Sequence, residues 1–485
     1  MSFFSAGFLL FLTVVFVLYY YVPVNRRYLV LLISSYVFYA FWDYRYVAVL
    51  LAVTMISYTA ARFMDRPYRK ALLILGIAAC VGTLVFFKFN YVLIGAVKLF
   101  EAGNDPDVMN AARIAAPVGL SFYVLEAIGY MADVYQQKTE VQKDPLRYAL
   151  FLSFFPIVLS GPIERSAGLL PQIYEDKIFN YEDVRHGLCM MLWGYMMKLL
   201  IADRISVIVN AAYKDYASMA GFTLAFAVVL YGVQLYADFA GYSFIAVGMG
   251  QIFGYRIRTN FRQPYLSGSI LEFWSRWHIS LSDWLKDYIY IPLGGNRRGT
   301  VRKCINLMIT FLISGIWHGE GLQFMFWGAL HGVYQIIGTL IHRGKKPDKS
   351  ETPGNIRTGI FKVIRVIITF ILVDLAWLFF RAGSMAEGFG ILGRIMFNPD
   401  ILNSIKDSAF LCGYDPGRFV WLLIWMMIMF AVDILREKGI SVYRFITGQR
   451  TVVRWSIYLV AVLLLLLGII RDFGMEASEF IYARF

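Results

Sequence analysis

Long apolar stretches alternate with short polar ones along almost the whole chain. A helix that crosses a membrane needs about 20 mainly apolar residues, because lipid offers its backbone groups no hydrogen-bond partners. The stretches predict roughly 11 membrane-spanning helices, with some of the shorter ones re-entrant. The candidate spans are 3–22, 28–42, 46–63, 71–89, 115–132, 148–162, 188–212, 221–252, 304–318, 322–341, 359–380, 418–435 and 453–470. We therefore predict an all-α, multi-pass membrane protein.

The apolar pattern contains no soluble domain, internal repeat or low-complexity tract. Of the 485 residues, 59% are hydrophobic and 16% are charged, whereas a soluble domain averages about a quarter charged residues. Lipid must therefore cover much of this surface. We expect one membrane-embedded domain over residues 1–485. The apolar run at 3–22 is too long for the apolar region of a cleaved signal peptide, and we interpret it as the first membrane helix.

Basic residues gather between the apolar spans. The chain holds 46 Lys and Arg against 33 Asp and Glu, which gives a net charge of +13. Basic loops between membrane helices tend to face the cytoplasm and its anionic lipids, so the charge indicates membrane lipid rather than nucleic acid as a partner. The basic stretches at 26–27, 62–70 and 342–358 are therefore expected inside. This assignment places the N-terminus and the tail at 471–485 on the outer side.

The segment 271–291, with the sequence LEFWSRWHISLSDWLKDYIYI, is too polar to span a bilayer. It carries two stripes at helical spacing. The apolar stripe contains Trp274, His278, Leu281, Leu285 and Tyr288, and the opposite stripe contains Arg276, Ser280, Asp283 and Asp287. The pattern predicts one amphipathic helix that lies at the membrane interface or dips into the protein.

Two of the five histidines are candidates for chemistry. Histidine is the default general base near neutral pH, and burial lowers its pKa so that it stays ready to accept a proton. His318 ends an apolar span, where an ionisable group is costly and marks a functional candidate. His278 lies on the apolar stripe. From these observations, each is either a catalytic base or a histidine buried by packing. His331 is interpreted as structural. His186 and His342 are interpreted as loop or helix-end residues, since no other candidate catalytic residue accompanies them in the sequence.

Several sequence blocks resemble the membrane-bound O-acyltransferase family. They are Arg276-Trp277-His278 with Leu281-Ser282-Asp283-Trp284, then Tyr290-Ile291-Pro292-Leu293-Gly294-Gly295, then Gly315-Ile316-Trp317-His318-Gly319, and the segments 154–172 and 234–250. Together these blocks cover most of residues 150–340 in the family's order. The resemblance is strongest to the bacterial branch of alginate and peptidoglycan O-acetyltransferases and teichoic-acid D-alanyltransferases.

The resemblance implies a fold and a reaction. The expected fold is a ring of tilted helices with a central funnel, where an acyl thioester enters from the cytoplasm and a hydroxyl acceptor from outside. The family's catalytic histidine falls on His318 and its second catalytic position on His278. His318 would deprotonate the acceptor hydroxyl, which then attacks the thioester carbonyl. Acetyl-CoA is the expected acyl donor, and no tightly bound cofactor is expected.

Other residues receive supporting roles. Asp238 is a second ionisable residue in a membrane span, and it either orients a histidine or holds a helix junction. Trp317 precedes His318 in the GIWHG block and is expected to support it. A basic run after the amphipathic segment would receive the phosphates of coenzyme A or lie simply in a cytoplasmic loop. The run comprises Arg297, Arg298, Arg302 and Lys303. The four cysteines are isolated, and no metal site is predicted.

The tail ends in Phe480-Ile481-Tyr482-Ala483-Arg484-Phe485, which resembles the F-x-Y-x-x-F ending of bacterial acyl-export systems. This resemblance makes Tyr482 a candidate acyl carrier, and the alternative is an aromatic anchor at the membrane interface. A phenol ester is a reactive carrier, because phenoxide leaves readily at a pKa of about 10. A tail of about 14 residues reaches roughly 45 Å, which is far enough to return to an outward funnel.

The sequence thus predicts an O-acetyltransferase of the bacterial cell membrane that exports acetyl groups for a cell-surface polysaccharide. An extracytoplasmic, SGNH or esterase-like acetyltransferase is the expected partner. D-alanyl transfer to teichoic acid is the close alternative, and a polysaccharide or lipid transporter is the alternative of another class. The sequence does not identify the polymer, and alginate, peptidoglycan and cellulose all stay open.

Overall fold

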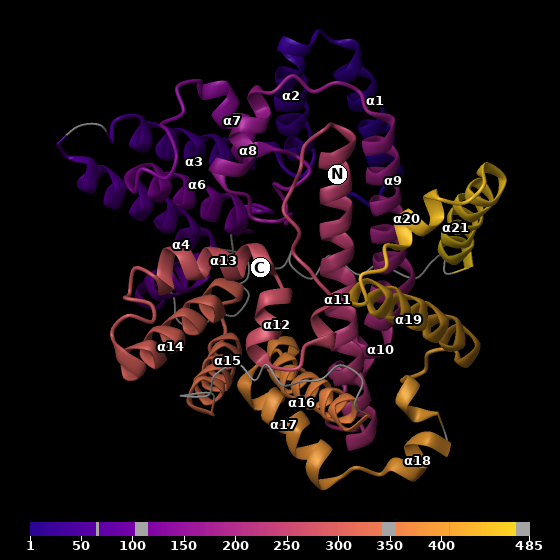
Figure 1. Cartoon of the computed structure of the whole chain (residues 1–485). Coiled ribbons are helices and arrows are strands. Elements are labelled where there is room, and N and C mark those ends of the chain that lie inside the picture. Colours follow the sequence, from indigo (N-terminus) through magenta and orange to yellow (C-terminus); the bar gives the residue numbers. More distant parts are fainter. Residues whose placement is uncertain (65–66, 102–114, 342–355, 407, 472–485) are drawn as a thin grey trace. The chain divides into compact units, whose positions relative to one another are not determined.

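The computed structural model describes residues 1–64, 67–101, 115–341, 356–406 and 408–471. The described residues form helices joined by turns and loops, with no β-strand among them. Figure 1 shows these helices in chain order, coloured from indigo to yellow. The all-α class predicted from the apolar pattern is confirmed.

Eight helices in the described part of the chain are long and apolar enough to cross a membrane. They are α3 (Tyr44–Arg62), α4 (Arg69–Glu101), α11 (Gly221–Ile252), α14 (Gly299–His318), α15 (Leu322–Ile341), α16 (Ile356–Arg381), α19 (Pro416–Glu437) and α21 (Thr451–Arg471). The chain is therefore a multi-pass membrane protein. The expected count of about 11 spans is not confirmed.

Several predicted spans form helices shorter than the roughly 20 residues that a bilayer requires. They are α1 (Ala6–Tyr21), α2 (Arg27–Ala40) and α6 (Leu120–Tyr135), of 16, 14 and 16 residues. The prediction of one span at 148–162 is wrong, since α7 (Pro145–Ser153) ends after 9 residues. Pro156 and Pro162 follow, and proline lacks the N–H that an α-helix needs.

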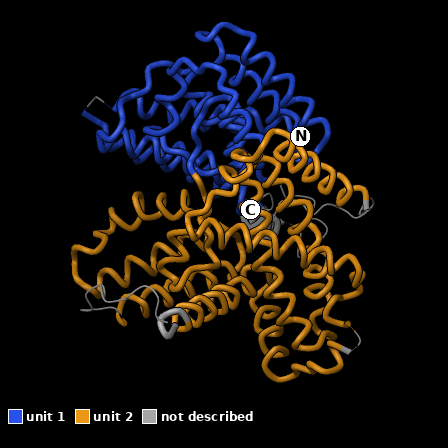
Figure 2. Tube along the Cα trace, turned by 45° about the vertical axis from the view of Figure 1, so that its right-hand side comes forward, with its two compact units in different colours: residues 1–188, 246–258 blue, residues 189–245, 259–485 orange. Residues whose placement is uncertain are grey.

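The chain divides into two compact units (Figure 2). The first unit comprises Met1–Leu188 and Ala246–Arg258, and the second comprises Cys189–Ile245 and Thr259–Phe485. In the first unit, α3, α4 and α6 pack against one another. The unit also contains α8 (Ser166–Tyr174) and the start of α9 (Tyr181–Met196). That the two units work as one domain stays a prediction.

The second unit contains the histidines selected from the sequence. Its shorter elements are the π-helix η2 (Met197–Ala202), α10 (Asp203–Lys214), η3 (Pro264–Leu266), α12 (Ile270–Arg276), α13 (Ile279–Leu285), the π-helix η4 (Lys286–Tyr290), α17 (Met385–Phe397), α18 (Ile401–Lys406), η5 (Ala409–Leu411) and α20 (Val442–Thr447). Its core is rich in aromatic side chains, among them the fully buried Trp277, Trp327 and Trp377. The candidate site lies within this aromatic core.

Candidate active site

His318 is the last residue of α14, where this helix turns into α15 to form a hairpin. Two glycines let the two helices touch. A Cβ atom at Gly315 would lie 2.4 Å from the carbonyl oxygen of Phe324, and one at Gly328 would lie 2.3 Å from that of Phe311. Only residues without a side chain fit contacts this short. The hairpin therefore fixes the position of His318.

The imidazole of His318 lies among three aromatic rings and is 2% exposed. Its ring centroid is 4.8 Å from that of Trp317, 5.0 Å from that of Trp327 and 5.3 Å from that of Phe380. Trp327 belongs to α15 and Phe380 to α16, so three helices surround the ring. Apolar walls keep water away from an imidazole and strengthen its electrostatic interactions.

His278 interrupts the segment that was predicted as one amphipathic helix. α12 ends at Arg276, α13 begins at Ile279, and the backbone of His278 between them is left-handed, with a φ of 42°. The prediction of one continuous helix over 271–291 is therefore wrong. Ser280, placed on its polar stripe, is fully buried. A non-glycine residue with positive φ is costly, and the surrounding structure must hold it in place.

Asn260 holds the chain in this turn. Its backbone carbonyl accepts a hydrogen bond from the N–H of Ile279 at 3.0 Å. Its side-chain Oδ1 accepts from the N–H of Ser280 at 3.2 Å and from the Ser280 hydroxyl at 2.6 Å. Asn260 is 1% exposed, so water cannot replace these bonds. The first residues of α13 are thus tied to the loop that precedes α12, and this tie offsets the strain at His278.

The ring of His278 is buried against Phe239 of α11, with 4.6 Å between the two centroids. Burial lowers the pKa of His278 to about 3, so this imidazole stays neutral at physiological pH and can accept a hydrogen bond. The centroid of Trp317 lies 6.3 Å from that of His278 and 4.8 Å from that of His318. Both candidate histidines therefore lie close to the same indole ring, that of Trp317.

Asp238 forms a buried ion pair next to this site. Its Oδ1 lies 2.7 Å from Nζ of Lys198, and Oδ1 of Asp203 lies 2.8 Å from the same nitrogen. All three residues are at most 4% exposed. Lys198 belongs to the π-helix η2, whose wider turns are common at functional sites. The ion pair fixes α11 one residue before Phe239, which touches His278. Asp238 therefore joins α11 to η2 through Lys198, and its role at the site stays a prediction.

The predicted basic run lies at the other end of α14 from His318. Arg297, Arg298 and Arg302 are exposed, and Lys303 is half-buried. Lys303 lines a cavity of about 640 Å³ together with Tyr334, Gln335 and Arg365 among others. The length of α14 thus separates the basic run from His318. Tyr482 lies outside the described residues.

Three features of the site were not selected from the sequence. Lys198 carries a signal, because a lysine in the apolar stretch at 188–212 needs a buried partner. Asn260 carries none, since asparagine is ordinary in a polar loop. Trp377 and Phe380 of α16 complete the aromatic walls, and Trp377 lies 5.6 Å from Trp327 in a stacked arrangement.

The third buried histidine is held by a tryptophan. His331 of α15 accepts a hydrogen bond at Nδ1 from Nε1 of Trp274, at 3.2 Å. The centroids of these two rings are 5.0 Å apart, and the centroid of His331 lies equally far from that of Trp327. The bond requires the proton of a neutral His331 to sit on Nε2. Because Nδ1 is engaged in this way, His331 is a suitable control for the proposed chemistry at His318.

Replacing Asn260 with alanine should lower acyl transfer about tenfold and destabilise the fold by roughly 1–3 kcal/mol, because it leaves the buried N–H of Ser280 without its acceptor. Ser280→Ala is the matched control, since it removes the hydroxyl and keeps the backbone bond to Asn260. Transfer rate and thermal unfolding of both variants give the comparison. Wild-type behaviour of Asn260→Ala would mean that Asn260 does not hold the His278 turn.

Comparison with known proteins identifies the family. Residues 130–379 match the MBOAT, membrane-bound O-acyltransferase family. This segment covers more than half of the chain and includes both histidines, Trp317 and Asp238. The chain belongs to the membrane-bound O-acyltransferase family. It is therefore an acyltransferase, and the aromatic site around His318 and His278 is the candidate centre of that activity.

Several curated relatives of this MBOAT chain are O-acetyltransferases. A probable alginate O-acetylase, AlgI, of Pseudomonas syringae pv. tomato is 35% identical over 85% of this chain and 78% of its own length. The peptidoglycan O-acetyltransferase of Helicobacter pylori is 31% identical over 94% of this chain and 91% of its own. The teichoic acid D-alanyltransferase of Bacillus subtilis is more distant, at 28% identity over 52% of this chain and 65% of its own length.

Proposed function

We propose that this acyltransferase moves an acetyl group from acetyl-CoA in the cytoplasm across the membrane, for O-acetylation of a cell-surface polysaccharide. The observation that carries the proposal is the arrangement of His318 and His278 around Trp317, in a dry aromatic site of a membrane protein. This chain is similar to an alginate O-acetylase over 85% of its length and to a peptidoglycan O-acetyltransferase over 94%. These similarities support acetyl as the transferred group and a polysaccharide as its destination.

In this proposal, His318 is the general base. Its neutral imidazole takes the proton of the acceptor hydroxyl as the oxygen attacks the carbonyl carbon of the thioester. The tetrahedral intermediate carries a negative charge on oxygen, and its collapse breaks the carbon–sulfur bond. The imidazolium of His318 then returns the proton to the departing thiolate. His278, neutral and buried, orients the reactants or relays the proton.

We propose that the donor binds on the cytoplasmic side. Arg297, Arg298, Arg302 and Lys303 would pair with phosphate groups of coenzyme A there, since guanidinium and ammonium groups bind phosphate strongly. The same orientation puts the basic stretch at 342–358 inside and both termini outside, in agreement with the distribution of positive charge. The membrane would be the inner or plasma membrane of a bacterium, since relatives of the chain come from bacteria.

The first acceptor in this proposal is Tyr482 of the tail at 471–485. Its phenol oxygen would receive the acetyl group at the outer end of the site, with His318 taking its proton. The resulting phenyl ester is more reactive than an alkyl ester, because phenoxide is a good leaving group. An extracytoplasmic SGNH or esterase-like partner would then take the acetyl group to the sugar hydroxyl.

The second candidate is transfer of D-alanine to teichoic acid. The likeness to the D-alanyltransferase of Bacillus subtilis supports it, but that likeness extends over 52% of this chain only. The tail motif around Tyr482 lies in the same chain as the enzyme, whereas the D-alanyl system is expected to use a separate small peptide. Acetyl transfer is therefore the preferred function. Release of labelled alanine rather than acetate from the polymer would reverse this order.

The experiment that tests the proposal follows the acetyl group through the tail. Membranes that contain the protein receive labelled acetyl-CoA, and the peptide with residues 472–485 is then analysed by mass spectrometry. We expect an acetyl ester on Tyr482 and its loss in Tyr482→Phe, together with most polymer acetylation. Tyr443→Phe, in α20, is the matched control and should keep both signals. Normal polymer acetylation by Tyr482→Phe would remove Tyr482 from the reaction, and an unlabelled polymer in the wild type would reject acetyl-CoA as donor.

A further inference from the structure

The hairpin of α14 and α15 places Trp327 against the ring of His318. Every Cα–Cβ bond of a helix is tilted towards the N-terminus of that helix. His318 ends α14 and so points back along it, while Trp327 of α15 points towards the turn where α15 begins. The two ring centroids are 5.0 Å apart, and the ring planes meet at 87°. The indole of Trp327 is therefore a neighbour of the proposed general base.

The indole N–H of Trp327 is a buried donor without an acceptor. In the described part of the chain, Nε1 makes no hydrogen bond, and the side chain is fully buried. Its ring lies among other rings, since the centroids of His331, Phe380 and Trp377 are 5.0, 5.1 and 5.6 Å away. A buried donor of this kind costs free energy, because folding removed its hydrogen bond to water. Such a group calls for an explanation, and an acceptor that a substrate brings is one.

Ser314 places a second donor of this kind beside His318. It precedes His318 by four residues on α14, and Cβ atoms at this spacing lie about 5–6 Å apart on one helix face. Ser314 is fully buried, and its hydroxyl makes no hydrogen bond to any described residue. The Thr310 hydroxyl, one turn earlier, instead bonds to the carbonyl oxygen of Asn306 at 2.7 Å. The helix thus engages the hydroxyl of Thr310 and leaves that of Ser314 available to a substrate.

The reaction proposed for His318 needs donors at its site. When the acceptor oxygen attacks the thioester, the π electrons of the carbonyl move onto its oxygen, which becomes an oxyanion. In a site without water, N–H and O–H groups that are already in place stabilise an oxyanion strongly, because they need not reorient during the reaction. His318 takes the proton of the attacking hydroxyl in this step. The donors to the oxyanion must therefore be other groups.

We propose that Nε1 of Trp327 and the hydroxyl of Ser314 donate hydrogen bonds to the carbonyl oxygen of the thioester and stabilise the oxyanion. The new carbon–oxygen bond forms as His318 takes the hydroxyl proton. The oxyanion then restores the carbonyl, and the carbon–sulfur bond breaks with its electron pair on sulfur. His318 returns the proton to this thiolate, so the products are a neutral thiol and the acyl ester. This inference rests on the proposed transfer from a thioester, whichever hydroxyl is the acceptor.

Steady-state transfer from labelled acetyl-CoA tests the two donors in membranes that contain the full-length protein. Trp327→Phe keeps an aromatic ring and removes the N–H. We expect kcat to fall at least about a hundredfold, as for the loss of one oxyanion donor. KM for acetyl-CoA should stay within about threefold, since these bonds strengthen only in the transition state. Ser314→Ala should lower kcat about tenfold, because it removes one hydrogen bond to a charged oxygen.

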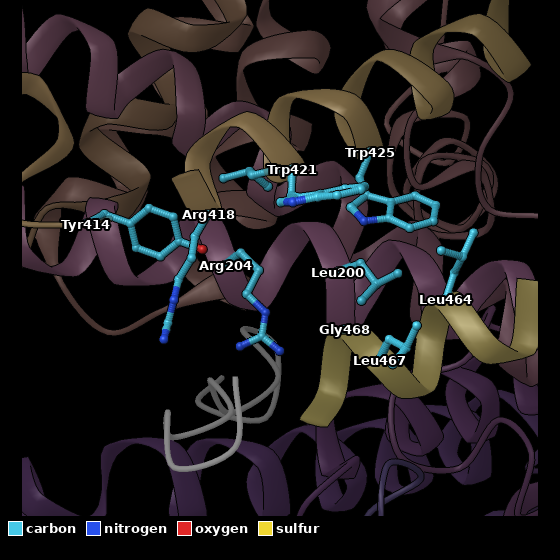
Figure 3. A pocket seen from close by; sticks show the side chains of 10 residues that line it. Leu200, Arg204, Tyr414, Arg418, Trp421, Trp425, Leu464, Leu467 and Gly468 are labelled. Atoms are coloured by element: carbon cyan, nitrogen blue, oxygen red, sulfur yellow. The ribbon is translucent and has the colours of Figure 1, made fainter. Parts of the chain in front are cut away.

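Two other tryptophans provide the controls. Trp377 is equally buried, its N–H also lacks an acceptor among the described residues, and its ring stacks on that of Trp327. Trp377→Phe should therefore cost similar thermal stability but lower kcat less than about tenfold. Trp425 of α19 lines a different part of the second unit, a pocket of about 160 Å³ shared with Leu200 and Leu464 (Figure 3). Trp425→Phe should keep the wild-type kcat.

An analogue of the same shape separates chemistry from packing. Benzothienylalanine at position 327 has sulfur in place of the N–H and keeps the two fused rings. The protein should then unfold at the wild-type temperature, while kcat falls as in Trp327→Phe. Wild-type kcat with this analogue overturns the proposal for Trp327, as does a larger loss in Trp377→Phe than in Trp327→Phe. Wild-type kcat in Ser314→Ala overturns the second donor.

The wild type distinguishes these failures from a failure of the proposed function. A wild-type protein that transfers nothing from labelled acetyl-CoA would overturn the proposed donor and this inference with it. A wild type that transfers acetyl, together with Trp327→Phe and Ser314→Ala proteins of equal kcat, would overturn the oxyanion donors alone.

Discussion

His318→Gln should lower the rate of acetyl transfer from acetyl-CoA at least about a hundredfold, because a positioned general base contributes roughly 10²–10⁴-fold. Glutamine is close to histidine in size but cannot take a proton at physiological pH. The ring lies at the end of a hairpin that Gly315 and Gly328 hold tightly, so the substitution should leave the backbone in place. Labelled acetate that reaches the tail or the polymer measures the rate.

The control for this variant is His331→Gln. His331 is equally buried, and its Nδ1 is engaged by Trp274. The glutamine amide oxygen can accept the same hydrogen bond, so we expect transfer to stay within about tenfold of the wild type. If His318→Gln were as active as His331→Gln, the general base would have to be another residue. His278, on the other side of Trp317, would then be the next candidate.

The second large effect concerns stability. Lys198→Met should lower the free energy of unfolding by about 3–5 kcal/mol, because it leaves Asp203 and Asp238 buried without their shared cation. Thermal or denaturant unfolding of the detergent-solubilised protein measures the loss. Asp238 directly precedes Phe239 on α11, and Phe239 contacts His278. Loss of the ion pair should therefore also disturb this contact and lower the rate of acyl transfer.

A triple variant distinguishes a lost charge partner from a lost packing contact. Lys198→Met/Asp203→Asn/Asp238→Asn removes the whole ion cluster and should recover most of the stability that Lys198→Met loses. Lys177→Met is the matched single control, since its partner Glu175 is 61% exposed and such pairs contribute under about 1 kcal/mol. Equal stability of Lys198→Met and Lys177→Met would mean that the buried cluster does not hold η2 to α11.

Hydropathy predicted the long helices well, because the bilayer imposes one length and one polarity on each of them. α15 has the predicted bounds, and α14 ends on His318 as expected. Hydropathy failed at 148–162, where two prolines end the helix and buried side chains such as Ser35 supply hydrogen bonds to the backbone instead. The hydroxyl of Ser35 accepts from the N–H of Phe155 at 3.0 Å. A hydrogen bond between segments this far apart in the sequence leaves no signal in the hydropathy of a short stretch of residues.

The same limit applies to the site. The motifs identified His318, His278 and Trp317, but the left-handed turn at His278 depends on Asn260, which lies 18 residues earlier and has no distinctive neighbours. The partner of Asp238 depends on how η2 packs against α11. The aromatic wall from α16 depends on which face of that helix is buried. Each of these contacts joins distant segments, and one sequence contains no record of their proximity.

The backbone at His278 changes how variation at this position should be understood. A left-handed residue between two helices excludes β-branched side chains whatever the reaction requires, while asparagine and glycine adopt it more readily. Selection therefore acts on position 278 twice, once through the imidazole and once through the turn. An inactive valine variant would mostly report a broken turn, whereas an asparagine variant would report the chemistry of the ring. Natural or engineered replacements at this position are informative about mechanism only when the new residue tolerates the same backbone.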